Sequence, residues 1–248
     1  MSSTSPLLRH NMCPPIASFP LRRFAGLQPQ ANLSEGHDTR AIMRKVSCDK
    51  IHLENGEIRG TEYWFRDVVR GTVCGDTNIA NATAVVYEVS CLVCKDIRPE
   101  QITILAWSQA QVDLIKSELI DSFYKDGVLP IAVHYVMDSG GCEADVVIAD
   151  LVAADAAKDY VESTKGPGNV PVEQAAGPTK ALSDRVKDSA NLRIGLTRAR
   201  YGLVVIGQGS WLTRRPRYNR SGEEERDHAE LVHDAFRREV YVRDKYSV

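Results

Sequence analysis

The chain has 248 residues, of which 43% are hydrophobic and 26% charged, and a formal net charge of −2. These values are typical of a globular protein with one large domain, or with one domain and tails. They exclude a membrane-spanning helix, because no apolar run approaches the roughly 20 residues that cross a bilayer, and we expect no membrane partner. They also exclude a bulk field that attracts nucleic acid, so any such binding must depend on a local patch.

The first part of the chain mixes helix, loop and strand. Paired prolines predict the start of a short helix over residues 14–25, and polar residues predict a loop over 26–45. An Asn-Gly pair predicts a hairpin over 51–58. Aromatic residues in alternation predict a strand over 61–69, and apolar residues at helical spacing predict a helix over 78–94.

From residue 102 onwards, short apolar strands alternate with amphipathic helices. We predict strands and helices at residues 102–107 (strand), 110–123 (helix), 131–136 (strand), 145–152 (strand), 183–200 (mostly helix) and 203–206 (strand). This alternation predicts an α/β fold with a mostly parallel sheet covered by helices on both faces. A stretch rich in Ala, Gly and Pro interrupts it at residues 153–182, and a terminal helix is expected within 223–242.

Six scattered cysteines indicate a reduced, intracellular protein of the cytoplasm or nucleus. Cys91 and Cys94 form a C-x-x-C pair, but the sequence has no second pair at zinc-ligand spacing. We therefore predict core packing for this pair and no metal site. Residues 1–34 contain Ser and Arg but no acid, so a mitochondrial presequence stays open as the less favoured alternative.

Four segments match, in order, the motifs of one protein family. Residues 9–20 (R-H-N-M-C-P-P-I-A-S-F-P) resemble its motif IV, Q-Y-R-M-H-P-x-I-A-x-F-P, and residues 104–112 (I-L-A-W-S-Q-A-Q-V) resemble its turn I-T-P-Y-x-x-Q-V. Residues 136–148 (V-M-D-S-G-G-C-E-A-D-V-V-I) are similar to motif V, T-V-D-S-F-Q-G-x-E-A-D-x-x-I-L. Residues 192–207 (L-R-I-G-L-T-R-A-R-Y-G-L-V-V-I-G) are similar to motif VI, L-N-V-A-L-T-R-A-R-x-x-L-x-I-x-G. The family is that of the superfamily 1 helicases of the nonsense-decay and senataxin group, and the match is to their C-terminal domain.

This resemblance implies a RecA-like domain of the P-loop NTPase type that lacks the phosphate loop itself. We expect residues 1–212 to form this second RecA-like helicase domain, with motifs IV to VI and a disordered insertion at 153–182. Residues 213–248 are expected to form a basic segment and a C-terminal helix. In the family, ATP lies between two RecA-like domains; the first supplies the phosphate loop and metal-binding acids, and the second inserts arginines toward the γ-phosphate.

The resemblance assigns roles to individual residues of motifs V and VI. Arg198 matches the catalytic arginine, a residue type whose planar, permanently charged fork pairs with phosphate oxygens. The nucleotide-binding positions implied are Glu143, Gly141 and Arg200. The nucleic-acid-binding positions implied are Asp138, Ser139 and Thr197. Taken alone, an arginine near a helix end is more often a solvated charge that favours the helix dipole, and for Ser139 a simple turn role is equally open.

A basic stretch follows motif VI. Residues 193–220 contain seven arginines and no acid, with Trp211 and Tyr218 interleaved. This composition predicts a patch that binds single-stranded RNA or DNA, with Arg214 and Arg215 among its contacts. Equally open is a basic surface that pairs with the acidic run at residues 223–225.

The chain also departs from the family. It has no G-x-x-x-x-G-K-[ST] phosphate loop and no Asp-Glu pair, so we expect ATP and Mg²⁺ to bind only in the presence of a first RecA-like domain. Asn11 replaces the motif IV arginine, Val136 replaces the motif V threonine, and Gly140 stands near the position of the motif V glutamine.

Two functions follow from these observations. The chain is either part of an ATP-dependent RNA or DNA helicase whose first domain lies upstream or on a partner, or a degenerate stand-alone module that binds nucleic acid or a helicase. Because the chain begins shortly before motif IV, we expect a truncated enzyme, inactive by itself. The altered motifs favour the binding module.

Overall fold

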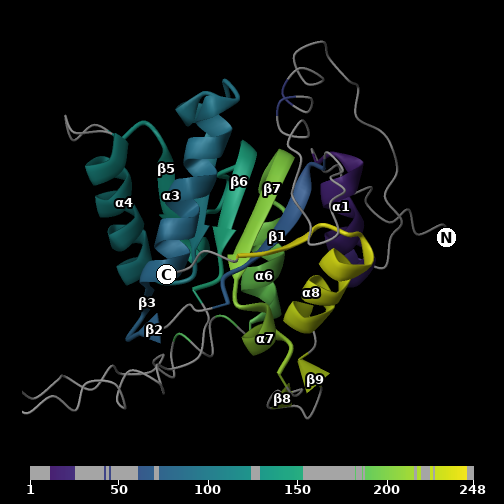
Figure 1. The fold of residues 1–248 in the computed structure, drawn as a ribbon. Coiled ribbons are helices and arrows are strands. Elements are labelled where there is room, and N and C mark those ends of the chain that lie inside the picture. Colours follow the sequence, from purple (N-terminus) through teal and green to yellow (C-terminus); the bar gives the residue numbers. More distant parts are fainter. Residues whose placement is uncertain are drawn as a thin grey trace, which may run out of the picture.

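A single sheet of six parallel strands organises the protein in the computed structural model (Figure 1). The structure describes residues 12–25, 42, 45, 61–69, 73–123, 129–152, 182, 186, 188–214, 217–218, 224–225 and 227–244. In order across the sheet, the strands are β10 (Tyr241–Arg243), β1 (Tyr63–Asp67), β7 (Ala199–Gly207), β6 (Ala144–Asp150), β4 (Ile102–Ala106) and β5 (Ala132–Tyr135). All five pairings between these neighbours are parallel. The predicted parallel α/β fold of the RecA-like type is therefore confirmed.

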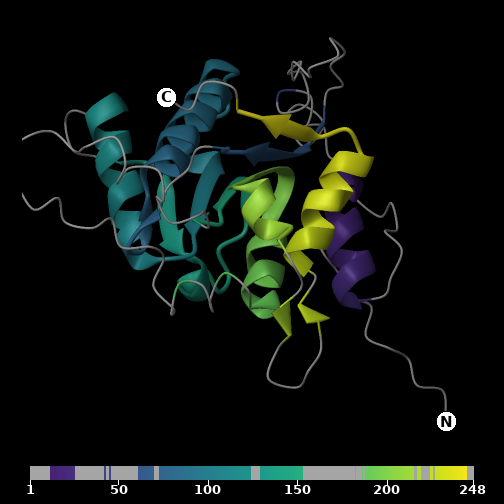
Figure 2. The same cartoon turned by 60° about the horizontal axis from the view of Figure 1, so that its bottom comes forward.

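The central strands are apolar because both faces of the sheet are covered. β4 and β6 lie side by side, and every residue from Val146 to Ala149 is fully buried. Helices α3 (Ile79–Cys94) and α4 (Gln109–Phe123) pack together on one face. Helices α1 (Pro14–Pro20), α6 (Ser189–Leu196) and α8 (Asp227–Arg237) lie on the other, as Figure 2 shows.

The remaining elements are short. They are the π-helical turn η1 (Leu21–Ala25), the 3-10 turns η2 (Pro99–Gln101) and η3 (Val136–Asp138), the four-residue helix α7 (Gly209–Leu212), and the two-stranded ribbons β2–β3 (Val73–Cys74 with Thr77–Asn78) and β8–β9 (Arg217–Tyr218 with Glu224–Glu225). The expected hairpin at residues 51–58 lies outside the described residues, as do 153–181 of the expected insertion.

One predicted helix was too long, and another lies where it was expected. The predicted helix at 183–200 was too long, because α6 ends at Leu196 and the chain enters β7 at Ala199. The terminal helix lies within the expected range 223–242, and α8 ends at Arg237. There Glu239 adopts a φ of 56°, and the N–H of Val240 donates to the carbonyl of Ala235 in a left-handed helix end.

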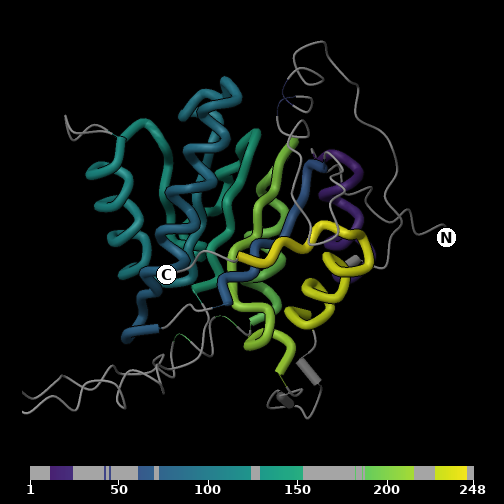
Figure 3. The backbone as a smooth tube through the Cα atoms, in the orientation of Figure 1, coloured from purple at the N-terminus to yellow at the C-terminus, as the bar shows by residue number. Residues whose placement is uncertain are grey.

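The chain then returns to the sheet as β10, which the sequence did not predict. β10 pairs with β1 beside the C-terminal helix, visible as the yellow tube in Figure 3. Tyr241 stacks between Phe65 and the exposed ring of Phe236, with ring centroids 5.4 Å and 3.8 Å away. The expected division at residue 212 therefore separates segments that share one sheet.

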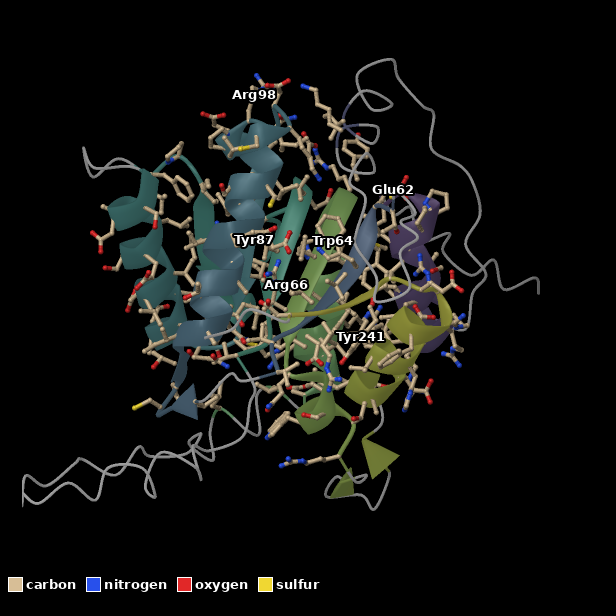
Figure 4. All side chains as sticks on the ribbon, in the orientation of Figure 1. Glu62, Trp64, Arg66, Tyr87, Arg98 and Tyr241 are labelled. Carbon is tan, nitrogen blue, oxygen red and sulfur yellow. The ribbon has the colours of Figure 1, made fainter. Side chains whose placement is uncertain are left out.

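Strand β1 is tied to α3 by a partly buried arginine. Arg66 donates to Glu88 of α3 at 2.6 Å and to Asp244 at 3.0 Å, and its guanidinium lies 4.5 Å from the ring centroid of Tyr87 (Figure 4). This arrangement explains why Glu88, the one charged residue of α3, is buried.

The outer face of α3 carries no charge. Cys94 is exposed there, so the prediction of core packing was wrong for this cysteine.

Candidate nucleotide-facing site

The motif V turn is a compact structure between β5 and β6. Ser139 is fully buried, and its hydroxyl donates to the carbonyl of Val136 at 2.6 Å. The N–H of Cys142 then donates to the carbonyl of Ser139 at 3.1 Å, and Gly141 takes a φ of 80°, a conformation that favours glycine. Ser139 therefore has the turn role, with its hydroxyl turned inward. Asp138 is exposed on the outer side of the turn.

At the amino ends of β6 and β7 the structure brings Glu143 and Arg200 together. Nε of Arg200 lies 3.5 Å from Oε2 of Glu143, and Nη1 lies 3.9 Å from Oδ1 of Asp145. The side chains of Arg200 and Glu143 are 40% and 37% exposed, so this pair is reachable from solvent. Asp145 was not among the expected site residues. It lies two residues after Glu143, at the start of β6, and this short spacing in the sequence lets both carboxylates reach Arg200.

Arg198 lies in the turn between α6 and β7, with a different environment from Arg200. Its Nε donates to the carbonyl of Ile194 at 3.3 Å, and its own carbonyl accepts from the N–H of Ala144 at 3.1 Å. Within the described part of the chain, no carboxylate lies within 4.0 Å of its guanidinium. The base of the side chain is thus anchored, while its two terminal nitrogens stay available to an anion.

Thr197 precedes this arginine and closes the helix. Its hydroxyl donates back to the carbonyls of Arg193 and Ile194, at 2.9 Å and 3.2 Å. Such bonds satisfy carbonyls that the last turn of a helix leaves without partners. The hydroxyl is therefore engaged within the turn that orients Arg198.

The motif IV segment joins the same edge of the sheet. The N–H of Cys13 donates to the carbonyl of Arg200 at 2.7 Å, immediately before α1 begins. Cys13 itself is buried, and burial raises the pKa of its thiol to about 12, so it remains a neutral packing residue. Asn11 and the residues before it lie outside the described residues. We call Cys13, Glu143, Asp145, Arg198 and Arg200 the amino-edge cluster.

The basic stretch does not form one surface, so that part of the expectation was wrong. Arg198 and Arg200 stand at the start of β7, whereas Arg214 is exposed beyond α7, which follows the other end of this strand. The two groups lie beyond opposite ends of β7, a strand of nine residues that rises about 3.3 Å per residue. Arg215 lies outside the described residues. The backbone of Arg217 pairs with that of Glu225, which places the basic stretch beside the acidic run, as the alternative reading expected.

A buried polar network occupies the opposite, carboxyl edge of the sheet. Asp150 is fully buried at the end of β6 and accepts hydrogen bonds from Asn81, Gln111 and the N–H of Val152, at 2.7, 2.7 and 2.8 Å. Burial raises the pKa of Asp150 to about 6, although these three donors lower it. Because protein groups satisfy the carboxylate completely, this network fastens α3 and α4 to β6.

The described residues contain neither a cluster of metal ligands nor a membrane-spanning helix. No group of three or more His, Cys, Asp and Glu side chains there is arranged to hold a metal ion. No described helix combines the length and apolarity needed to cross a membrane.

Comparisons with known proteins bear on the family. No curated protein matches the chain. Among solved structures, it is similar to the C-terminal domain of a possible DNA helicase from Lactobacillus plantarum WCFS1, at 12% identity and a TM-score of 0.40, over 87% of this chain and 100% of that chain. A likeness at that score supports no functional inference. The model of the AAA_12 family, described as an AAA domain, matches residues 8–210. This range contains the whole amino-edge cluster. The chain therefore belongs to this family of AAA domains.

Proposed function

We propose that this chain is the second RecA-like domain of an ATP-dependent superfamily 1 helicase acting on RNA or DNA, of the nonsense-decay and senataxin type. In this function it contributes arginine and motif V contacts to a nucleotide held by a first RecA-like domain. The AAA-domain family and the order of motifs IV, V and VI support the assignment. By itself the chain does not hydrolyse ATP, because its sequence lacks a phosphate loop.

One observation carries this proposal: the three motifs converge on one edge of the sheet. Cys13 of motif IV and Ala144 of motif V donate their backbone N–H groups to the carbonyls of Arg200 and Arg198 of motif VI, at 2.7 Å and 3.1 Å. Segments far apart in the sequence thus hold the backbone on both sides of Ala199. Phosphoryl transfer depends mainly on positioned positive charge, and a rigid edge of this kind provides it.

The two arginines of this edge have different tasks. Arg198, with anchored Nε and available terminal nitrogens, is the candidate for the γ-phosphate. Arg200 is already paired with Glu143 and Asp145, so its single positive charge offsets part of the negative charge that would otherwise repel a nucleotide. Glu143 and Gly141 then shape the rim where the nucleotide sugar would lie.

ATP and Mg²⁺ enter this proposal only together with a first RecA-like domain. That domain would supply the phosphate loop and the metal-binding acids. The implied partners are this domain, on the same or another chain, and a single strand of RNA or DNA. Asp138, Thr197 and Arg214 remain the candidate contacts to the strand, while Ser139 supports the turn from inside.

A second function is favoured by one specific observation. Arg200, expected to face the nucleotide, is paired within the chain to two carboxylates. A domain that no longer binds ATP tolerates an arginine that is paired within the chain. The replaced residues of motifs IV and V are also expected in a domain that has lost ATP binding. This second function is a stand-alone module that binds nucleic acid or a helicase partner.

ATP hydrolysis separates the two functions. The assay compares the purified chain with the same chain joined to a first RecA-like domain of an AAA_12-family helicase, with and without single-stranded RNA or DNA. The proposed function predicts turnover only for the joined protein. No turnover by the joined protein, combined with binding of strands by the chain alone, supports the binding module instead.

A further inference from the structure

The C-terminal helix α8 is fastened to α1, the helix that follows motif IV. Asp234 of α8 is only 3% exposed and pairs with Arg22 at 2.6 Å. Asp227, at the start of α8, pairs with Arg23. Two ion pairs thus join α8 to η1, the turn that directly follows α1, although these segments lie at opposite ends of the sequence.

Arg238, just beyond the last turn of α8, donates two hydrogen bonds to α1. Nη2 donates to the carbonyl of Pro15 at 2.6 Å, and Nη1 donates to the hydroxyl of Ser18 at 2.9 Å. Asp234 lies 3.4 Å away and balances the charge, and the guanidinium lies 4.9 Å from the ring centroid of Tyr63. A planar fork that fills several acceptors at once fixes the position of its target.

The contact continues from α1 to the amino-edge cluster. Pro15, whose carbonyl receives Arg238, lies in the first turn of α1. Two residues earlier, the N–H of Cys13 donates to the carbonyl of Arg200. The guanidinium of Arg238 is therefore linked through one helical turn and one hydrogen bond to the backbone of motif VI.

We infer that Arg238 and Asp234 are positioning residues for the amino-edge cluster, and that α8 is the clamp that holds motif IV against motif VI. The predicted effect on catalysis rests on the proposed function, whereas the predicted effect on the stability of this edge does not. Displacement of a positioned group by about 1 Å reduces catalysis on the order of a hundredfold. Loosening α1 is thus expected to change the rate more than the binding of ATP.

Hydrogen exchange of the intact chain tests the structural part. In Arg238→Met the apolar stem is retained and the fork is lost. We expect the amides of residues 12–25, and that of Ala144, to exchange at least roughly tenfold faster, while β4 keeps its protection. Arg237→Met is the matched control, since Arg237 is 61% exposed and its ion pairs with described residues are long, at 3.7 Å to Glu230 and 4.0 Å to Asp234. Arg22→Met is a second, milder variant, because the side chain of Arg22 is 51% exposed.

Kinetics of the chain joined to a first RecA-like domain test the catalytic part. Arg238→Met should lower kcat on the order of a hundredfold with a smaller change in KM. Arg238→Lys should recover part of the lost kcat, because the positive charge and one donor nitrogen remain. Unchanged exchange at residues 12–25 overturns the clamp. Faster exchange with unchanged kcat overturns the positioning role. If the unsubstituted joined protein is inactive, the proposed function fails, and the exchange at Cys13 and Ala144 still decides whether α8 positions this edge.

Discussion

Gly195 of motif VI lies directly against the indole of Trp107, the residue that follows β4. A Cβ atom on Gly195 would stand 2.5 Å from Cη2 of the indole, closer than packed carbon atoms approach. The helicase pattern that this segment resembles has alanine at the position of Gly195 and tyrosine at that of Trp107. In this chain a smaller residue, Gly195, is thus combined with a larger ring, Trp107. Their contact sets the distance between α6 and the sheet.

Gly195→Ala is therefore expected to destabilise the protein by about 1–3 kcal/mol, because a fully buried ring has to move. Urea unfolding followed by circular dichroism measures the change. Gly140→Ala is the control, since no atom lies within 4 Å of its added Cβ. Equal stability of both variants would mean that Trp107 has free space beside it.

The Asp150 network predicts a strong effect at Gln111. This side chain accepts from the N–H of Asn78 at 2.7 Å and donates to Asp150 at 2.7 Å. Gln111→Ala leaves both groups buried without this partner, at a cost of about 2–4 kcal/mol. Gln109→Ala, which removes only an exposed bond to Asp113, should change stability by less than about 0.5 kcal/mol. A small effect at Gln111 would show that water replaces the amide.

His228 predicts acid sensitivity. Burial lowers its pKa to about 4 from a usual 6.5, although Asp227 raises it. Because the folded pKa is the lower one, the unfolded chain binds the proton first, and stability is lost as pH falls from 6.5 toward 4. Between pH 7 and pH 4.5 this proton uptake lowers the free energy of unfolding on the order of 2 kcal/mol, and His228→Leu should remove that loss. Unfolding midpoints at these two pH values measure it, and an identical slope in both proteins would contradict the assignment.

The separation of the arginines predicts which edge binds a single strand. Arg214 is a candidate strand contact and Arg198 is assigned to the nucleotide, so Arg214→Ala should weaken strand binding and lower the salt slope by about 0.7, whereas Arg198→Ala should have little effect. Fluorescence anisotropy with a labelled oligonucleotide between 50 and 200 mM salt, on the order of physiological ionic strength, provides both values. The reverse pattern would place the strand at the amino edge. Affinity that ignores salt would argue against arginine–phosphate contacts altogether.

Much of the fold was predictable because its signals are local. Short apolar runs such as residues 146–149 are typical of strands buried on both faces in a covered parallel sheet, and their alternation with amphipathic helices indicated the fold class. Motif VI indicated Arg198 for the same reason, since its letters are contiguous. The length of its helix was misjudged because Ala199 and Arg200 are both good helix formers, and only the pairing of Ala199 with Ala144 places them in a strand.

The contacts between distant segments were not predictable. Arg238 and Pro15 are 223 residues apart and meet only in the folded protein, and nothing in the sequence around either residue indicates the other. The same holds for the strand at Tyr241, where three residues suffice because Phe65 and Phe236 enclose the tyrosine ring. The basic stretch looked like one patch because the sequence does not show that nine residues of strand run through its middle.

The most direct test of the central claim is ATP hydrolysis by the chain joined to a first RecA-like domain, with Arg198 replaced by alanine. A positioned arginine at the transferred phosphate contributes roughly 10³-fold or more to the rate, so Arg198→Ala should reduce kcat by at least that order while circular dichroism and unfolding stay unchanged. Arg193→Ala, an exposed arginine of α6, is the matched control and should retain the rate. Normal turnover by the Arg198→Ala protein would contradict the claim that this edge of the sheet faces the nucleotide.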